Sequence, residues 1–160
     1  DELTYRHYDV GIRRYFENDW SISLKYRHTY KKKKGSWDLS EQRPQFQISK
    51  VVKNDFVKLS ARFRQEYRMR KGDDVMRSRL RLYAQSSKKF LTLRPFVSNE
   101  FFYDPEIKRH SKNFTDIGIK LPKISYFTPS IYYRNIRSYE EENHIWEDDH
   151  VILFKVIVKW

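Results

Sequence analysis

The sequence predicts an all-β protein, an antiparallel up-and-down transmembrane β-barrel of about ten strands, nine of which lie within a single domain at residues 1–160. Apolar and polar residues alternate over long stretches, which is the period of a strand and not of a helix. Aromatic residues make up 17% of the chain, which excludes a disordered protein even though 34% of the residues are charged. No segment approaches the roughly 18 consecutive apolar residues of a membrane-spanning helix. The lack of cysteine in the sequence excludes a disulfide-stapled or thiolate-metal domain.

Strands can be assigned along the chain from this alternation. From Trp20 to Tyr30, apolar residues and a histidine alternate with serine, lysine, arginine and threonine. From Val57 to Met69, and again from Met76 to Ala84, the alternating polar residues are mainly arginine. Less regular alternation marks the other strands. The sequence predicts strands at about 5–15, 20–30, 38–51, 57–70, 76–85, 90–103, 114–121, 125–139 and 149–160.

Prolines and polar connections interrupt these strands. Pro44, Pro95 and Pro129 lie inside predicted strands, where we expect bulges or a local loss of ladder pairing because proline cannot donate a backbone hydrogen bond. Short turns are predicted at 17–19, 53–55, 86–89 and 122–124. Longer polar loops, which alternate with them as in an up-and-down meander, are predicted at 32–37, 71–75, 104–113 and 140–148.

The strand count predicts where the two ends of the chain lie. If Trp160 is on the periplasmic side, the long loops face outward and the short turns face the periplasm. Nine antiparallel strands then place residue 1 on the outer side, whereas single-chain bacterial barrels have an even number of strands. We therefore expect either a further N-terminal strand or a partner that pairs with this edge.

A soluble barrel and a membrane barrel share the same alternation, with opposite faces toward the interior. The strand from Trp20 to Tyr30 favours the membrane, because its length of about 33 Å becomes about 25 Å of height after a tilt near 40°. Aromatic residues near strand ends on the apolar face are typical of a girdle at the membrane interface, with ordinary core aromatics as the alternative. The predicted girdle residues are Trp20, Tyr30, Tyr67, Phe101, Tyr103 and Trp160.

The polar faces of neighbouring strands carry far more basic than acidic residues, in keeping with a formal net charge of +12. Like charges on adjacent strands repel one another unless carboxylates from elsewhere reach them. A closed lumen would let Glu41, Glu100 and Asp116 do so, and arginine suits such pairing because it donates two parallel hydrogen bonds. The predicted lumen-lining residues are Lys58, Arg62, Arg64, Glu66, Arg68, Arg77, Arg79, Arg81, Arg94 and Glu100.

The chain ends in alternating apolar residues that close on an aromatic residue. These are Phe154, Val156, Val158 and Trp160, preceded by Ile152. The pattern resembles the C-terminal signal that the barrel assembly machinery reads in bacterial outer-membrane proteins. Together with segments 63–68, 77–82 and 94–102, it resembles a widespread family of small outer-membrane barrels that is known only as a domain of unknown function. The resemblance extends over about residues 20–160 and implies a fold and a bacterial outer-membrane location, but no activity. Such barrels usually carry acidic or balanced charge, unlike this chain.

Neither a catalytic constellation nor a metal site can be assigned from the sequence. His110 and Ser111 lie in a predicted loop, and no base with an orienting group is identifiable that would activate the serine. The five histidines lack the spacing of a metal site, and the acidic residues within 140–149 fit a solvated loop better than a cation site. We therefore predict no enzymatic activity, no metal and no cofactor.

The predicted function is that of a non-enzymatic outer-membrane barrel, a structural or accessory component of a larger membrane protein complex. Its predicted partners are the assembly machinery and outer-membrane lipid or lipopolysaccharide, whose phosphates would neutralise the lysines at 31–34. A narrow anion-selective pore lined by the arginines is the first alternative. A soluble basic barrel that binds lipid or nucleic acid is the second. Nucleic acid is disfavoured because the aromatic residues lie mainly opposite the arginines and could not stack bases beside them.

Overall fold

The computed structural model describes residues 5–33, 36–105, 108–140 and 144–158. Within these ranges the chain forms nine β-strands and one short 3-10 turn at Glu17–Asp19, which confirms the prediction of an all-β chain with nine strands. None of the described residues belong to a helix long and apolar enough to cross a membrane. The strands are β1 (Tyr5–Tyr15), β2 (Trp20–Lys33), β3 (Ser36–Lys53), β4 (Val57–Arg70), β5 (Asp73–Ser86), β6 (Arg94–Asp104), β7 (Arg109–Lys120), β8 (Phe127–Glu140) and β9 (Ile145–Val158).

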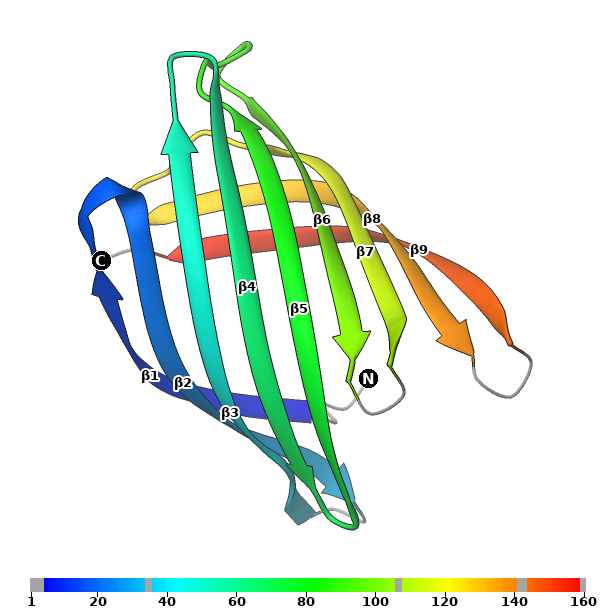
Figure 1. Cartoon of the computed structure of the whole chain (residues 1–160). Coiled ribbons are helices and arrows are strands. Elements are labelled where there is room, and N and C mark those ends of the chain that lie inside the picture. Colours follow the sequence, from blue (N-terminus) through cyan, green and yellow to red (C-terminus); the bar gives the residue numbers. More distant parts are fainter. Residues whose placement is uncertain (1–4, 34–35, 106–107, 141–143, 159–160) are drawn as a thin grey trace.

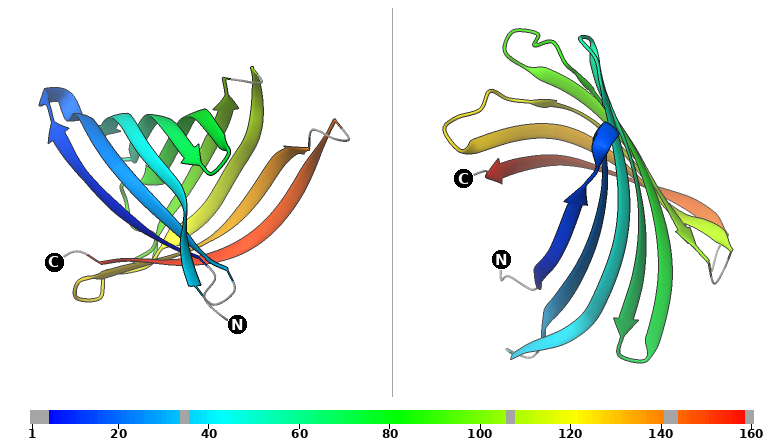
Figure 2. Two further views of the ribbon diagram at one scale, coloured as in Figure 1. Left: turned by 90° about the horizontal axis from the view of Figure 1, so that it is seen from below. Right: turned by 60° about the vertical axis from the view of Figure 1, so that its left-hand side comes forward.

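The nine strands form one antiparallel sheet in which every strand pairs with its neighbours in sequence, in the order β1 to β9 (Figure 1). The sheet curves into a trough (Figure 2). Its two edge strands, β1 and β9, are not hydrogen-bonded to each other, so the sheet is not closed into the predicted barrel. With nine antiparallel strands, β1 and β9 run in the same direction and cannot form the antiparallel pair that would complete the meander.

The connections between strands lie at two opposite ends of the sheet. The upper end in Figure 1 carries the connections 16–19, 54–56, 87–93 and 121–126, and β9 ends there. The lower end carries the other four connections and the start of β1. The described chain therefore starts and finishes at opposite ends of the sheet, as the strand count predicts.

The predicted lengths of the connections are wrong. At the lower end, β5 begins at Asp73, β7 at Arg109 and β9 at Ile145, all inside segments predicted to be long loops. The lysines at 31–33 continue β2 in the same way, while Lys34 lies outside the described residues. The longer connections are at the upper end, for example 87–93. Hydropathy reports the environment of side chains and not the hydrogen bonding of the backbone, so polar strand ends look like loops in the sequence.

The strand predicted at 90–103 begins instead at Arg94. Phe90 and Leu93 exchange two backbone hydrogen bonds of 2.9 Å, which is the geometry of a tight turn. Leu91 and Thr92 at its centre have φ values of 48° and 73°, a region that side-chain-bearing residues rarely adopt. Apolar residues at these positions therefore belong to the turn and not to the apolar face of the strand.

Each of the three prolines lacks a ladder partner on one of its two neighbouring strands. Residues Arg43 and Pro44 have no ladder partner on β4, which confirms the predicted local loss of pairing. Pro95 pairs with Ile119 on β7 and Pro129 pairs with Val156 on β9, but Pro95 has no ladder partner on β5 and Pro129 has none on β7. The register shifts at other positions: between Thr29 and Tyr30 in the ladder of β2 with β3, and between Phe102 and Tyr103 in the ladder of β6 with β7.

The polar face of the sheet is the buried one. Among the residues that the structure describes, thirteen of the buried ones are polar or charged, whereas two, Phe96 and Phe102, are large hydrophobic residues. The polar face is also the concave face, because Arg62 on β4 lies 2.8 Å from Glu100 on β6, across the intervening strand β5. The apolar residues of the alternating pattern cover the convex face and are exposed there, as Leu80 and Phe63 illustrate.

Gly118 on β7 provides a first test of the packing on the concave face. A Cβ atom at this position would lie 2.3 Å from Cβ of Tyr132 and 2.4 Å from the carbonyl oxygen of Ile131 on β8. We expect Gly118→Ala to lower the free energy of unfolding by about 1–3 kcal/mol, because it overpacks this site. The measurement is urea-induced unfolding, with Ser111→Ala on the same strand as the control, and equal effects of the two variants would contradict the expectation.

Candidate functional site: the charged concave face

The concave face carries a network of carboxylates and arginines centred on Glu66 of β4. The Glu66 side chain is fully buried, with 0% of its surface exposed. Its carboxylate accepts hydrogen bonds from Arg79 Nη1 at 2.8 Å, Arg77 Nη2 at 3.2 Å and Arg64 Nη1 at 3.3 Å. Arg43 approaches from β3, with Nη1 at 3.6 Å. Because Glu66 pairs in register with Arg77 on β5, the ladder itself brings these groups together.

Glu41 extends the network toward the lower end. This buried carboxylate on β3 accepts hydrogen bonds from Arg68 Nη2 at 2.6 Å and from Arg70 Nε at 2.9 Å. It also forms an ion pair with Arg43, its neighbour two positions along the strand. Arg43 thus joins the carboxylates of Glu41 and Glu66.

Glu100 extends the network across the sheet to β6. Its carboxylate oxygen Oε1 lies 2.8 Å from Arg62 Nη2 and 3.0 Å from Arg79 Nη2. Arg79 therefore binds the carboxylates of Glu66 and Glu100 at once. The ion pairs form a continuous chain over four adjacent strands, β3 to β6.

Asp116 on β7 organises a second cluster. Arg134 on β8 donates to it through two nitrogens, with Nε at 2.6 Å from Oδ1 and Nη2 at 3.0 Å from Oδ2. Ser98 donates from β6 at 3.1 Å, and Arg81 Nη2 lies at 3.4 Å. The bidentate geometry of the Arg134 pair fixes the carboxylate in one orientation.

Carboxylates are a minority in both clusters. Four of them, Glu41, Glu66, Glu100 and Asp116, hold nine arginines, which confirms the prediction that acids on other strands reach the basic strands. These arginines are Arg43, Arg62, Arg64, Arg68, Arg70, Arg77, Arg79, Arg81 and Arg134. Removing four carboxylates and nine guanidinium groups from water is costly, so each carboxylate is stabilised by several arginines.

The predicted lumen-lining residues fall into two groups. Eight of the ten take part in the two clusters: Arg62, Arg64, Glu66, Arg68, Arg77, Arg79, Arg81 and Glu100. Lys58 shares their face of β4 by alternation but lies at the start of the strand, away from these pairs. Arg94 is exposed at the first position of β6.

Sequence reasoning missed Arg43, Arg70 and Arg134. The signal for Arg43 is present, because Glu41, Arg43, Gln45 and Gln47 alternate along the predicted strand 38–51, and all four are buried. Arg70 is the last residue of β4, and Arg134 follows two tyrosines on β8. Only the register of β4 with β3 and of β8 with β7 brings them to Glu41 and Asp116.

Several aromatic residues share the concave face with the arginines and are exceptions to the expectation that the two kinds of residue lie mainly on opposite faces. The guanidinium carbon of Arg79 lies 4.5 Å from the ring centroid of Phe102, which is itself 4.8 Å from the ring of Phe114. Arg134 lies 4.8 Å from the ring of Phe114 and 5.5 Å from that of Tyr132. These rings cover the planar faces of the cations while the carboxylates bind their edges.

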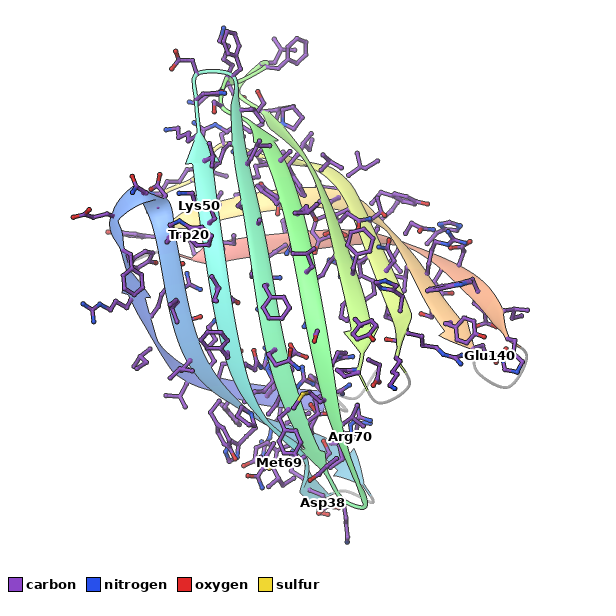
Figure 3. All side chains as sticks on the ribbon, viewed as in Figure 1. Trp20, Asp38, Lys50, Met69, Arg70 and Glu140 are labelled. Atoms are coloured by element: carbon purple, nitrogen blue, oxygen red, sulfur yellow. The ribbon has the colours of Figure 1, made fainter. Side chains whose placement is uncertain are left out.

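The convex face carries the predicted girdle residues that the structure describes. Trp20 lies at the upper end beside Lys50, whose Nζ is 5.1 Å from its ring (Figure 3). Toward the lower end, Phe101 and Tyr103 flank the ring of His110 at 6.4 and 5.7 Å. Tyr30 and Tyr67 also lie toward that end, and Trp160 lies outside the described residues.

The residues of the predicted assembly signal are partly described. Phe154 and Val156 are exposed on the convex face of β9, as the alternation predicts. The backbone of Val158 pairs with Phe127 of β8. The side chain of Val158 and all of Trp160 lie outside the described part of the chain.

Histidines and acids form no metal centre in the described ranges, where no group of three or more such residues is placed to hold an ion. His110, predicted to lie in a loop, belongs to strand β7. Asp148, also predicted in a loop, belongs to β9 and pairs with Arg137 at 3.1 Å. Two other acidic residues of the same predicted loop, Glu141 and Glu142, lie outside the described residues.

Comparison with known proteins identifies a family and no relative of known activity. A family model described as "Protein of unknown function (DUF2490)" matches residues 1–147. No curated protein and no solved structure matches the chain.

Proposed function

The chain belongs to the DUF2490 family of proteins of unknown function, and from the arrangement of its two faces we propose that it is a β-barrel of the bacterial outer membrane. In this role it is a structural or accessory component of a membrane protein complex and not an enzyme. The observation that carries the proposal is the inverted burial of the sheet, with charged residues inside and apolar residues outside.

Water would not favour this arrangement of side chains. Soluble monomers rarely expose continuous apolar patches larger than a few hundred Å². Here large hydrophobic residues are exposed on every strand, from Ile12 on β1 to Phe154 on β9. In a membrane barrel the same residues face lipid, and the charged residues face a lumen.

The spacing of the aromatic residues supports the same proposal. Between Trp20 and Tyr30, the convex face of β2 carries Ile22, Leu24, Tyr26 and His28. This segment spans about 33 Å along the strand and about 25 Å of height at a tilt near 40°, which is the apolar band of an outer-membrane barrel. Trp20 lies toward the upper margin of the convex face and Tyr103 with His110 toward the lower margin, where an interface offers both water and hydrocarbon.

Closure of the barrel belongs to this proposal. The edge strands β1 and β9 run in the same direction, so an antiparallel strand that pairs with both would complete a barrel with an even number of strands. Such a strand is supplied either by the same protein or by a partner. An unpaired edge in lipid is costly because its backbone groups find no hydrogen-bond partners there.

Membrane fractionation tests the proposed location. We expect the full-length protein to sediment with bacterial outer membranes, to resist extraction by carbonate at high pH, and to dissolve in detergent. Tryptophan fluorescence of the reconstituted protein should be quenched by lipids brominated near the interface, and Trp20→Phe should reduce that quenching. Recovery of folded protein in buffer without detergent would overturn the proposal and favour a soluble basic barrel that binds lipid or nucleic acid.

A narrow anion-selective pore is the second candidate, favoured by the excess of arginines on the concave face. The continuous chain of ion pairs from β3 to β6 supports a filled interior instead, as in other barrels of eight to ten strands. We therefore expect no steady current in planar bilayers. A steady anion-selective current that Arg62→Ala makes less selective would establish the pore.

A further inference from the structure

A hollow of about 410 Å³ lies on the convex face of the sheet, toward its lower end. Strands β6 to β9 form it, and Asn113 at its centre pairs in register with Phe101 on one side and Arg137 on the other. Apolar residues cover most of the convex face, so a polar site here is unusual. The residues that line this convex hollow are Asn99, Phe101, His110, Lys112, Asn113, Arg137 and Trp146.

Asn99 on β6 and Asn113 on β7 are hydrogen-bonded to each other. Asn99 Nδ2 donates to Asn113 Oδ1 at 3.1 Å and to Thr115 Oγ1 at 2.8 Å, and Asn113 Nδ2 donates to Asn99 Oδ1 at 3.0 Å. Thr115 Oγ1 donates to Asn113 Oδ1 at 3.3 Å. Each amide nitrogen carries two hydrogens and each amide oxygen has two lone pairs. Within the described part of the chain, these bonds leave one N–H of Asn113 and one lone pair of Asn99 Oδ1 available to a ligand.

The available donor and acceptor of this asparagine pair together fit a hydroxyl group. A hydroxyl group donates one hydrogen bond and accepts others, so it can bind both amides at once. An ionised phosphate offers acceptors only, and an ammonium group offers donors only. The asparagine pair therefore selects a ligand that carries hydroxyl groups.

The two fixed cations of the lining do not select an anion. Arg137 forms an ion pair of 3.1 Å with Asp148, which is its ladder partner on β9. Lys112 lines the hollow, but its Nζ lies 5.8 Å from the ring of Phe114, which packs against buried Phe102 on the concave face. The charge of Arg137 is therefore balanced and that of Lys112 lies toward the other face, so the convex hollow favours an uncharged group.

Aromatic rings form the rest of the wall. Phe101 on β6 lies beside His110, with ring centroids 6.4 Å apart. Trp146 on β9 is exposed, and the guanidinium carbon of Arg137 lies 5.7 Å from its ring. Such rings offer flat apolar surfaces to C–H groups. A sugar ring carries both C–H groups and hydroxyl groups, so it matches the aromatic and the amide parts of the hollow.

We propose that the convex hollow binds a sugar unit in the head group of a glycolipid. The lipid source rests on the proposed function, because the girdle residue Phe101 lies at the lower margin of the apolar band, where the head groups of a bilayer are found. The sugar contacts Asn113 and Trp146, and the acyl chains lie along apolar residues closer to the middle of the sheet, such as exposed Ile117.

Calorimetric titration of the full-length protein, in a zwitterionic detergent that carries no sugar, tests the site with three probes. They are lipopolysaccharide in mixed micelles, phosphatidylglycerol in mixed micelles at the same lipid charge, and the water-soluble saccharide made by deacylating the same lipopolysaccharide. We expect lipopolysaccharide to bind about tenfold or more tighter than phosphatidylglycerol, because only the former carries the sugar. The saccharide should bind more weakly than lipopolysaccharide, since it lacks the acyl chains that contact the apolar face.

The variant Trp146→Ala should weaken the binding of lipopolysaccharide about tenfold, because it removes a ring from the wall of the hollow. Trp37→Ala is the matched control. Trp37 also lies near the lower end, with the guanidinium carbon of Arg6 4.3 Å from its ring, but it is outside the hollow. This control should change affinity less than about twofold.

Asn113→Leu is a second variant that keeps the size of the side chain but removes the amide. It should weaken binding about fivefold or more, whereas Asn135→Leu, on the same face of β8 but outside the hollow, should change affinity less than about twofold.

Three results would overturn the proposal: equal affinity for lipopolysaccharide and phosphatidylglycerol, wild-type affinity in both Trp146→Ala and Asn113→Leu, or equal affinity for the saccharide and lipopolysaccharide, which would identify a soluble sugar as the ligand. If fractionation shows the protein to be soluble, the saccharide titration is run in buffer. Failure of the membrane proposal and failure of the sugar site are therefore distinguishable.

Discussion

Replacing Glu66 by glutamine should lower the free energy of unfolding by about 3–5 kcal/mol, the range found when one partner of a buried ion pair is removed. Glu66 is fully buried and is the carboxylate on which Arg43, Arg64, Arg77 and Arg79 converge. Glutamine keeps the shape but removes the charge, so four guanidinium groups would repel one another in a poorly solvated interior. Urea-induced unfolding of protein reconstituted in lipid vesicles measures the change.

Asp148→Asn is the matched control for this variant. Asp148 also pairs with an arginine, Arg137, but their side chains are 45% and 52% exposed. Exposed ion pairs contribute about 0–1 kcal/mol, so this variant should differ little from wild type. If Glu66→Gln and Asp148→Asn lower the free energy of unfolding by similarly small amounts, the Glu66 network does not stabilise the concave face.

Leu80→Arg should destabilise the membrane-embedded protein by about 2–4 kcal/mol, the cost of a basic residue on the lipid face near the midplane of a barrel. Leu80 lies at the middle of β5, is 42% exposed, and pairs across the sheet with Phe63 and Phe101. On a protein surface in water, the same substitution of an exposed residue usually changes stability by no more than about 0.5 kcal/mol. The variant therefore distinguishes lipid from water as the solvent of the convex face.

Val52→Arg is the control that places an arginine near the membrane interface instead of near the midplane. Val52 is 53% exposed on the same face, but it lies one residue from the end of β3. Near the membrane interface an arginine costs only about 0–1 kcal/mol. A large difference between the two variants in vesicles supports the proposed membrane position, and two equally small effects would argue for a soluble sheet.

The division of each strand into two faces was predictable from the sequence alone. Along β4, the alternation from Val57 to Met69 places Arg62, Arg64 and Glu66 on one face and Phe63 on the other, as observed. This holds because successive side chains of a strand point to opposite sides whatever the strand pairs with. The expectation that distant carboxylates reach the basic strands was also correct, because Glu41, Glu100 and Asp116 lie on the same face as the arginines.

The positions of strand ends and turns were less predictable from the sequence. The apolar residues of 90–93 resemble a strand, yet positive φ angles at Leu91 and Thr92 form a turn. Arg109 and Asp104 look like loop residues, yet they pair in the ladder of β6 and β7. Backbone hydrogen bonds decide these boundaries, and hydropathy does not report them.

The sequence by itself determined that the chain is a nine-stranded β-meander with one charged and one apolar face, because both properties follow from the local period of the side chains. Only the tertiary structure decided that the charged face is concave and buried, which arginines meet Glu66 and which meet Asp116, and that the edges β1 and β9 remain apart. Those features depend on the curvature and register of the sheet, through which Arg62 and Glu100 meet across an intervening strand. Curvature and register arise from all the strands together, and no local pattern of residues specifies them.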